Sequence, residues 1–195
     1  KRVLVIFRGI NVDYFSNSTV TNEKINKLNI DLGLSSETFK ILLPGRLTRW
    51  KGQEMFIESL NLLRTKYGKN NFQSVILGHH QGRKVYFKKL VSMMEKYQLK
   101  KNIIFLSNFR EMPVIYYISD AVVSSSIEPE AFGRVAVEAQ AMQKPIIASD
   151  FGGSKETIID GKTGFLFKNG SPESLAEYLN NVIEMDKDKL QSIGN

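Results

Sequence analysis

The sequence has no cysteine and only two histidines among its 195 residues. Without cysteine it can form neither disulfide bonds nor thiolate metal sites. The histidines, His79 and His80, are adjacent, so we expect their side chains to diverge, and no third ligand follows them at helical spacing. We therefore predict that the protein has no metal site.

Long hydrophobic runs, linkers and repeats are also missing. No apolar run reaches the ~20 residues that a membrane-spanning helix needs. No stretch rich in proline and glycine and no internal repeat divides the chain, so we predict one domain over residues 1–195. With 42% hydrophobic residues, a chain of this length can bury a substantial core.

Two phosphate-binding signatures are absent. No G-x-G-x-x-G motif follows any predicted strand, which argues against a nicotinamide or flavin site. The stretch Gly161-Lys162-Thr163 looks like the end of a P-loop, but Glu156 stands where that motif requires its first glycine. We expect a turn at this position.

What the sequence does have is an excess of positive charge, with 27 Lys and Arg residues against 20 Asp and Glu residues. The net charge of +7 favours anionic partners such as phosphorylated ligands, nucleic acid or anionic lipid. The basic residues lie among acidic ones and no aromatic stacking face accompanies them, which argues against nucleic acid. A basic helix around Phe87–Tyr97 leaves peripheral contact with an anionic membrane open.

Short apolar runs rich in β-forming residues alternate with amphipathic stretches along the chain. Because these runs do not alternate between apolar and polar residues, we expect both faces of the sheet to be covered. The pattern predicts an α/β fold with a Rossmann-like, doubly wound, mostly parallel sheet, whose ligands bind at the carboxyl ends of the strands. The predicted strands are Val3–Phe7, Phe39–Leu43, Ser74–Leu77, Ile103–Leu106, Ala121–Ser124, Pro145–Ala148 and Phe165–Phe167.

Apolar residues at helical spacing predict the helices between these strands. One stripe follows the second strand and comprises Met55, Phe56, Leu60 and Leu63. Another follows the third strand and comprises Val85, Leu90, Met93, Met94 and Tyr97. A last helix is expected from Pro172 to about Leu190.

The loop after the second predicted strand, PGRLTRWKGQ, brings Arg46, Arg49 and Lys51 to a turn that leads into a helix. Helix amino ends attract anions, and an Arg with a Lys at such a site can hold a phosphate or diphosphate. Taken alone, a solvated basic loop would explain the same residues.

The loop after the fifth predicted strand leads into EPEAFGRVAVEAQAM, where Glu130 and Glu138 stand eight residues apart. Gly133 would let backbone approach a ligand, and the helix that begins there would point its amino end at the same edge of the sheet. Glu138 would lie about 7.5 Å along that helix, tilted back toward its start. The two acids can therefore bind hydroxyl groups on either side of an anion. The alternatives are an exposed helix residue at 138 and a helix-dipole partner at 130.

Four segments in this order, GRLTRWKGQ, EPEAFGRVAVEAQAM, PIIASDFGGSKETI and DGKTGFLF, carry a resemblance to a known family. They resemble the C-terminal donor-binding domain of retaining GT-B glycosyltransferases of family four, in the capsule and lipopolysaccharide group. The segment RGINVDYF is similar to the family's Gly-Val-Asp-x-x-x-Phe segment, which follows the linker from an N-terminal acceptor domain. The resemblance implies that residues 1–195 form the nucleotide-sugar-binding half of a two-domain enzyme, with the acceptor domain absent from this chain.

The resemblance also implies roles for individual residues. The catalytic positions would be Arg46 and Lys51, which bind the donor diphosphate and stabilise the leaving nucleotide, and Glu130, which contacts the donor sugar. Glu138 would hold the ribose. The other donor-binding positions would be Gly45, the segment Asn108 and Phe109 near the base, and the backbone amides of Phe132, Gly133 and Arg134.

The implied reaction moves a sugar, of the hexose type, from a UDP- or GDP-sugar to a glycan or lipid-linked acceptor with retention of configuration. Fixed cations and a helix dipole would stabilise the departing diphosphate without a metal or another cofactor. The resemblance implies cell-surface polysaccharide or lipopolysaccharide synthesis in the cytoplasm, with peripheral contact at the inner face of the membrane allowed. The domain alone is expected to be inactive, because the family's acceptor site lies in the other half.

Other function classes are left open by the residues. A glycosidase would use Glu130 and Glu138 as acid and nucleophile, ~5–5.5 Å or ~6.5–9.5 Å apart, and would need no phosphate clamp. A non-catalytic basic module would bind nucleotide or membrane by charge alone, and a nucleotide-sugar epimerase-like domain would bind the same donor. Binding of UDP or GDP distinguishes the glycosidase, which would bind neither.

Overall fold

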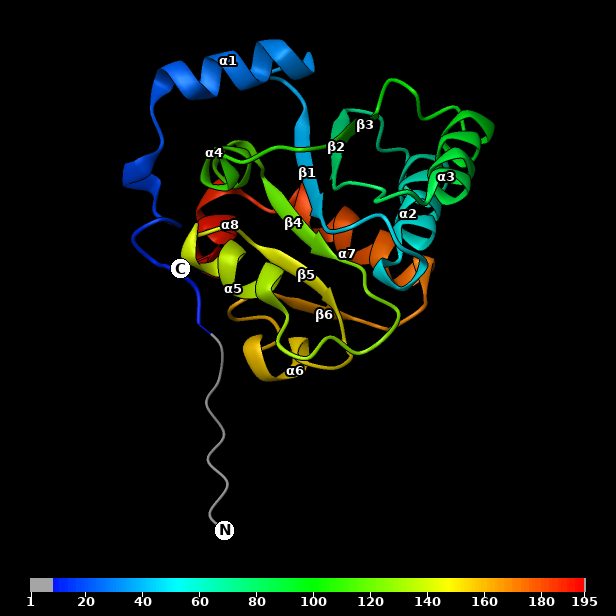
Figure 1. Ribbon diagram of the computed structural model, residues 1–195. Coiled ribbons are helices and arrows are strands. Elements are labelled where there is room, and N and C mark those ends of the chain that lie inside the picture. Colours follow the sequence, from blue (N-terminus) through cyan, green and yellow to red (C-terminus); the bar gives the residue numbers. More distant parts are fainter. Residues whose placement is uncertain (1–8, 195) are drawn as a thin grey trace.

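Six strands form one parallel sheet in the computed structural model, which describes residues 9–194 (Figure 1). The strands are β1 (Phe39–Pro44), β2 (Phe72–Leu77), β3 (Ile103–Leu106), β4 (Ala121–Ser124), β5 (Ile146–Ser149) and β6 (Phe165–Phe167), in the spatial order β3-β2-β1-β4-β5-β6. The predicted Rossmann-like α/β fold is confirmed. The expected strand at Val3–Phe7 lies outside the described residues, and the other six lie within two residues of their predicted ends.

Successive residues of a strand point to opposite faces of the sheet, and the central strands thereby build two apolar layers. On β4, Ala121 and Val123 face one cluster of buried side chains, while Val122 faces the other. All four residues of β4 and all four of β5 are buried. Because both faces are covered, these strands appear in the sequence as unbroken apolar runs.

Helices cover both faces of the sheet (Figure 1). They are α1 (Asn22–Leu32), α2 (Gln53–Thr65), α3 (Lys84–Lys96), α4 (Met112–Ile118), α5 (Arg134–Ala141), α6 (Ser154–Thr157), α7 (Pro172–Glu184) and α8 (Lys187–Gly194), with the short 3-10 helices η1 (Asn17–Thr19) and η2 (Arg49–Lys51). A back cluster around Phe56 and Leu179 joins α2, α3 and α7 to the sheet, and a front cluster around Leu28 and Tyr116 joins α1, α4 and α5 to it. No helix within residues 9–194 has both the length and the apolar character needed to cross a membrane.

The helix expected from Pro172 to about Leu190 is interrupted. α7 ends at Glu184, and Met185 takes an extended conformation. Asp186 then starts α8, because its Oδ1 accepts a hydrogen bond from the N–H of Lys189 at 2.7 Å. An aspartate in this position satisfies the amides of a new helix and competes with continuation of the old one. The prediction of a single helix is therefore wrong, although most of the segment is helical.

α3 turns most of the expected stripe to the sheet, since Met93 and Tyr97 pack against the back cluster beside the buried Leu90 and Met94, and Val85 is the exception. Leu90 and Met94 are buried in the back cluster, but Val85 is 85% exposed. Leu90 follows Val85 by five positions, which places them about 140° apart around the helix. The assignment of Val85 to the core stripe is therefore wrong.

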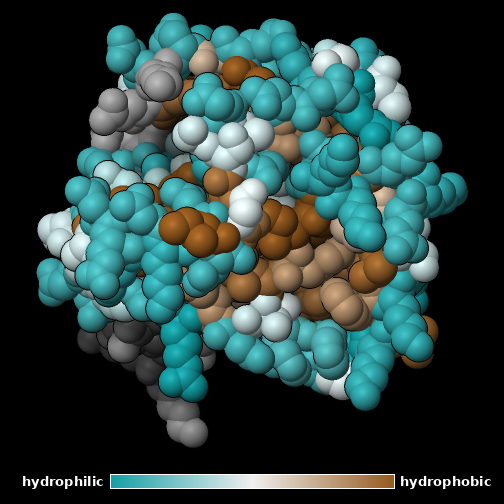
Figure 2. All heavy atoms as spheres, turned by 90° about the horizontal axis from the view of Figure 1, so that it is seen from above, coloured by the Kyte–Doolittle hydropathy of each residue, from teal (hydrophilic) through white to brown (hydrophobic). Residues whose placement is uncertain are grey.

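The front cluster reaches the surface beside α1. Leu28 is buried in this cluster, while Leu32 and Leu34 pack against it and are only partly buried. The view from above, with α1 toward the reader, shows an apolar hollow surrounded by hydrophilic side chains (Figure 2). The front layer is thus less completely covered than the sheet interior.

We expect Leu90→Ala to lower the free energy of unfolding by about 2–5 kcal/mol, because it removes a fully buried side chain from the back cluster. The matched control is Val85→Ala on the same helix, which should change this free energy by less than about 0.5 kcal/mol. Urea unfolding followed by circular dichroism measures both. Equal losses in the two variants would contradict the orientation of α3.

Candidate functional site

The loop after β1 is held in place through its backbone. Gly45 donates its N–H to the carbonyl of Leu77 at 2.8 Å, which extends the pairing of β1 with β2. The side-chain amide of Gln53, at the start of α2, donates to the carbonyl of Arg46 at 2.9 Å. Gln53 is itself buried. Arg46 therefore combines a fixed backbone with an exposed side chain.

The two loops that the sequence predicts to converge lie side by side. Ile127 donates its N–H to the carbonyl of Trp50 at 2.8 Å, and the hydroxyl of Ser125 donates to the carbonyl of Lys51 at 2.9 Å. Gly52 permits this approach, because a β-carbon there would lie 1.9 Å from the carbonyl oxygen of Ser125. The basic loop after β1 and the acidic loop after β4 therefore form one surface, which we call the joined surface, at the carboxyl edge of the sheet.

Lys51 and Glu130 form an ion pair at the centre of the joined surface. The Lys51 Nζ lies 2.6 Å from the Glu130 Oε1, and each side chain is 13% exposed. The hydroxyl of Ser126 donates to the same carboxylate oxygen. The Trp50 ring centre lies 4.5 Å from the Lys51 Nζ and 5.7 Å from the Arg46 Cζ, so both cations lie against the indole. The site thus presents two cations and one carboxylate close together.

Glu138 lies on α5 and is largely buried. Its side chain is 9% exposed. The hydroxyl of Tyr116 donates to Oε2 at 2.9 Å, and Nη2 of Arg134 donates to Oε1 at 2.9 Å. Burial, followed by the charge of Glu138, raises the pKa of Tyr116 well above its ordinary value, so this hydroxyl remains a donor. The alternative of an ordinary exposed helix residue at position 138 is therefore wrong.

The amino end of α5 lies next to the joined surface. Gly133 precedes Arg134 in the left-handed conformation, with φ of 73°, which glycine adopts without strain. Since glycine has no side chain with which to cap the helix, the first turn of α5 can offer its backbone N–H groups to an anion. Gly153 supports this turn from the loop between β5 and α6, donating its N–H to the carbonyl of Glu130 at 2.8 Å. A β-carbon on Gly153 would lie 2.7 Å from the carbonyl carbon of Phe132.

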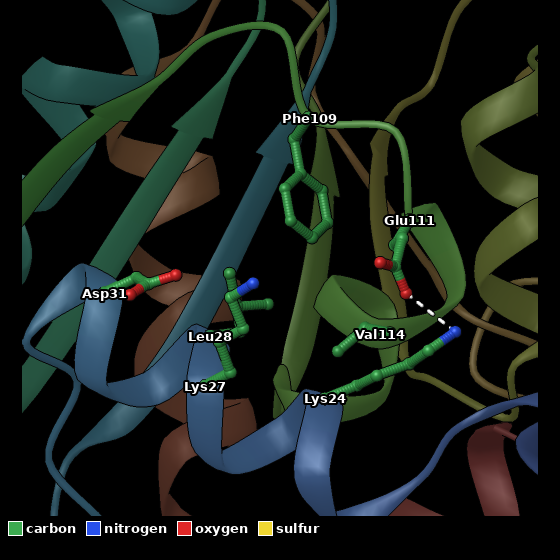
Figure 3. Close-up of a pocket in the computed structure, with 7 residues that line it drawn as sticks. All are labelled: Lys24, Lys27, Leu28, Asp31, Phe109, Glu111 and Val114. Carbon is green, nitrogen blue, oxygen red and sulfur yellow. Dashed lines mark ion pairs between the residues drawn. The ribbon is translucent and has the colours of Figure 1, made fainter.

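The expected base-binding segment does not place its aromatic ring on the joined surface. Asn108 is exposed and has a positive φ of 57°. The ring of Phe109 points toward Leu28 in a cavity of about 220 Å³ between α1 and the start of α4 (Figure 3). Lys24 and Glu111 form an ion pair of 2.8 Å at this cavity. Arg46, Lys51 and Glu130 do not line this cavity, so the structure does not bring the Phe109 side chain together with them.

His79 and His80 stack where they were expected to diverge. Their ring centres lie 4.7 Å apart with 21° between the ring planes. The Nδ1 atom of His79 accepts the N–H of Gln81 at 2.8 Å, and that of His80 accepts the N–H of Gly82 at 3.2 Å. These turn contacts orient both rings alike, and the expectation of divergence is wrong. Within the described part of the chain, no group of three or more His, Asp or Glu side chains is arranged to hold a metal ion.

Two partners of the predicted acids were not anticipated from the sequence. Ser126 precedes Glu130 by only four residues, and its hydroxyl could have been proposed from that proximity. Tyr116 precedes Glu138 by 22 residues and lies on another helix. Its apolar neighbours in the sequence predict a core residue, so no local signal indicates the contact with Glu138.

A family model and a curated relative match nearly the whole chain. The model described as Glycosyl transferases group 1 matches residues 24–195. The D-inositol 3-phosphate glycosyltransferase of Corynebacterium glutamicum (strain R) is 28% identical over 192 residues, which cover 97% of this chain and 45% of the relative. The chain spans about half the length of the curated relatives it matches.

Two solved structures have the same fold, and both are more similar in sequence to this chain than the relative from C. glutamicum. A glycosyltransferase from Rickettsia africae ESF-5 matches with a TM-score of 0.92 at 33% identity. The Anabaena protein HepE, in complex with UDP-glucose, matches with a TM-score of 0.88 at 30% identity. Each match covers 98% of this chain and 50% of the other. The chain therefore belongs to the glycosyl transferases group 1 family and forms a C-terminal domain of the GT-B type.

Proposed function

We propose that this domain binds the nucleotide diphosphate sugar donor of a retaining glycosyltransferase. The observation that carries the proposal is the joined surface, on which Arg46 and Lys51 lie beside Glu130 and the amino end of α5. The complex of HepE with UDP-glucose supports a sugar nucleotide as the ligand. A glycosidase would have no use for the cations of this surface.

The diphosphate would lie between the two cations and the first turn of α5. Arg46 offers an exposed guanidinium, Lys51 an ammonium, and α5 the backbone N–H groups that follow Gly133. Negative charge develops on the diphosphate as the sugar departs, and fixed positive groups stabilise that charge without rearrangement. For this reason we propose that transfer is independent of metal ions.

Lys51 and Glu130 would exchange partners when the donor binds. A diphosphate carries more negative charge than one carboxylate and so competes for the Lys51 ammonium. Glu130 would retain the hydroxyl of Ser126 and gain the capacity to accept a hydrogen bond from a sugar hydroxyl. That contact would orient the reacting sugar.

Glu138 would hold the ribose at the other end of the diphosphate. Its carboxylate already accepts hydrogen bonds from Tyr116 and Arg134, and it has further lone pairs for hydroxyl donors. The base would lie against the backbone of Asn108 and Phe109, since the ring of Phe109 packs between helices.

The acceptor is proposed to be a glycan or lipid-linked glycan of cell-surface polysaccharide or lipopolysaccharide synthesis in the cytoplasm. The support for this choice is the resemblance of four sequence segments to the capsule and lipopolysaccharide group. The relative from C. glutamicum has an inositol phosphate in its name, so acceptor screening should include that class as well.

Removing either acid should affect the binding of different ligands. Glu138→Ala should weaken the binding of both UDP and UDP-glucose, or of the matching GDP pair, by about 1.5–3 kcal/mol, as expected for a lost hydrogen bond to a charged group. Glu130→Ala should lower the affinity for the nucleotide sugar, because the sugar contacts this carboxylate. It should not lower the affinity for the bare nucleotide, because it removes only a competitor of the diphosphate for Lys51. Isothermal titration calorimetry measures all four affinities.

Two variants serve as controls for these titrations. Glu128→Ala removes an exposed acid from the same loop and should change neither affinity. Arg46→Ala should lower the affinity for both ligands, because both carry the diphosphate. The loss of affinity should be smaller at high salt, because salt screens the interaction between the charges. Equal loss of nucleotide affinity in Glu130→Ala and Glu138→Ala would show that the acids do not contact separate parts of the donor.

Chelation should leave donor binding unchanged. Arg46, Lys51 and the start of α5 supply the positive charge that a divalent cation supplies in other phosphate sites. Affinity for UDP and GDP should therefore be the same in EDTA and in magnesium. A tenfold loss in EDTA would refute metal independence.

The 195-residue chain should bind the donor without transferring its sugar. The proposed roles of its residues all concern the donor, and the chain covers about half the length of its relatives. Radiolabelled UDP-glucose and GDP-mannose, incubated with mixed glycan and lipid-linked acceptors, should give no labelled product. Transfer above the level of a protein-free control would contradict this expectation.

A further inference from the structure

Tyr116 is a buried hydrogen-bond partner of Glu138, the carboxylate that is proposed to hold the ribose. It lies on α4 and is fully buried. Its hydroxyl crosses from α4 to α5 and donates to the Glu138 Oε2 at 2.9 Å. A fully packed ring has one available position, so the hydroxyl position is fixed by the core of the domain.

The second partner of Glu138 is held much less firmly. Arg134 donates to Oε1 from the preceding turn of the same helix, but its side chain is 65% exposed. Ion pairs of this i,i+4 spacing with an exposed partner stabilise a helix only weakly, and a long side chain such as arginine readily moves out of the pair. The direction of the Glu138 carboxylate is therefore set mainly by Tyr116.

Tyr116 also connects Glu138 to the segment proposed to face the base. Its ring packs edge-on against Phe15 at 5.9 Å, and Phe15 packs edge-on against Tyr14 at 5.0 Å. The Tyr14 hydroxyl donates to the carbonyl of Arg110 at 2.8 Å, directly after Asn108 and Phe109. Helix α4 begins only two residues further on, so the loop and Tyr116 are parts of one packed unit.

The geometry of the carboxylate has a chemical consequence. An ionised carboxylate accepts about four hydrogen bonds, two on each oxygen. Tyr116 uses one acceptor site on Oε2 and Arg134 uses one on Oε1. One site remains on each oxygen, which matches the two neighbouring hydroxyl donors of a ribose.

We propose that Tyr116 is a positioning residue that directs the free acceptor sites of Glu138 at the 2′- and 3′-hydroxyls, and so determines selectivity for ribonucleotides over deoxyribonucleotides. This proposal rests on the role of Glu138 proposed above. Tyr116 does not contact the ligand in this arrangement and acts only through Glu138.

The test compares UDP or GDP, whichever binds more tightly, with its 2′-deoxy analogue by isothermal titration calorimetry. The wild-type chain should prefer the ribonucleotide by about tenfold or more, the value of one hydrogen bond to a charged group. Tyr116→Phe keeps the ring and removes only the hydroxyl. It should reduce this preference at least threefold, mainly by weakening the ribonucleotide.

Tyr117→Phe is the matched control, since it removes the hydroxyl of the adjacent, exposed tyrosine on α4. This variant should keep the wild-type preference. The ratio of the two affinities does not depend on the fraction of folded protein, so partial unfolding cannot imitate the effect. The double variant Tyr116→Phe/Glu138→Ala should show the same preference as Glu138→Ala alone, because Tyr116 acts through the carboxylate.

Failure of this proposal and failure of the proposed function give different results. If Glu138→Ala abolishes the preference but Tyr116→Phe retains it, or weakens both nucleotides equally, Tyr116 is merely structural and the positioning role is refuted. If Glu138→Ala itself retains the wild-type preference, Glu138 does not hold the ribose, and both proposals fall.

Discussion

The parallel direction of all six strands is the constraint on which the rest of the structure depends. Because every strand runs the same way, the loops that follow β1, β4 and β5 leave from one edge. Residues more than 70 positions apart, such as Lys51 and Glu130, are thereby brought into direct contact. The glycines at 52 and 153 then let these loops approach each other at the distance of backbone contact.

The two acids of the site differ in how firmly they are held. Glu130 is paired with a lysine whose long side chain can change partners, and it also accepts a hydrogen bond from the hydroxyl of Ser126. Glu138 is fixed by a tyrosine inside the core. One carboxylate can therefore respond to an incoming anion while the other keeps its direction. This difference suits a donor whose sugar must react and whose nucleoside must only be held.

The sheet and the meeting of its loops could be predicted because both follow from local patterns. Unbroken apolar runs gave the strands, and parallel strands imply a common edge for Arg46, Lys51 and Glu130. The helices were harder to predict than the strands. α1 has a single buried residue, Leu28, so its apolar signal in the sequence is weak. The break before α8 depends on the cap of Asp186. The contact of Tyr116 with Glu138 could not be predicted, because it joins two helices through the core.

The place of β1 in the sheet has a consequence for the order in which the domain assembles. β1 is the first described strand to be synthesised, yet it lies in the middle and pairs with β2 on one side and β4 on the other. The link to the β4 side joins Lys40 to Asp120, 80 residues later, through a hydrogen bond of 2.7 Å. A chain emerging from the ribosome can pair β1, β2 and β3 first, but the loops of the candidate site meet only after β4 has docked. Donor binding at the proposed site would therefore report the docking of β4 during synthesis.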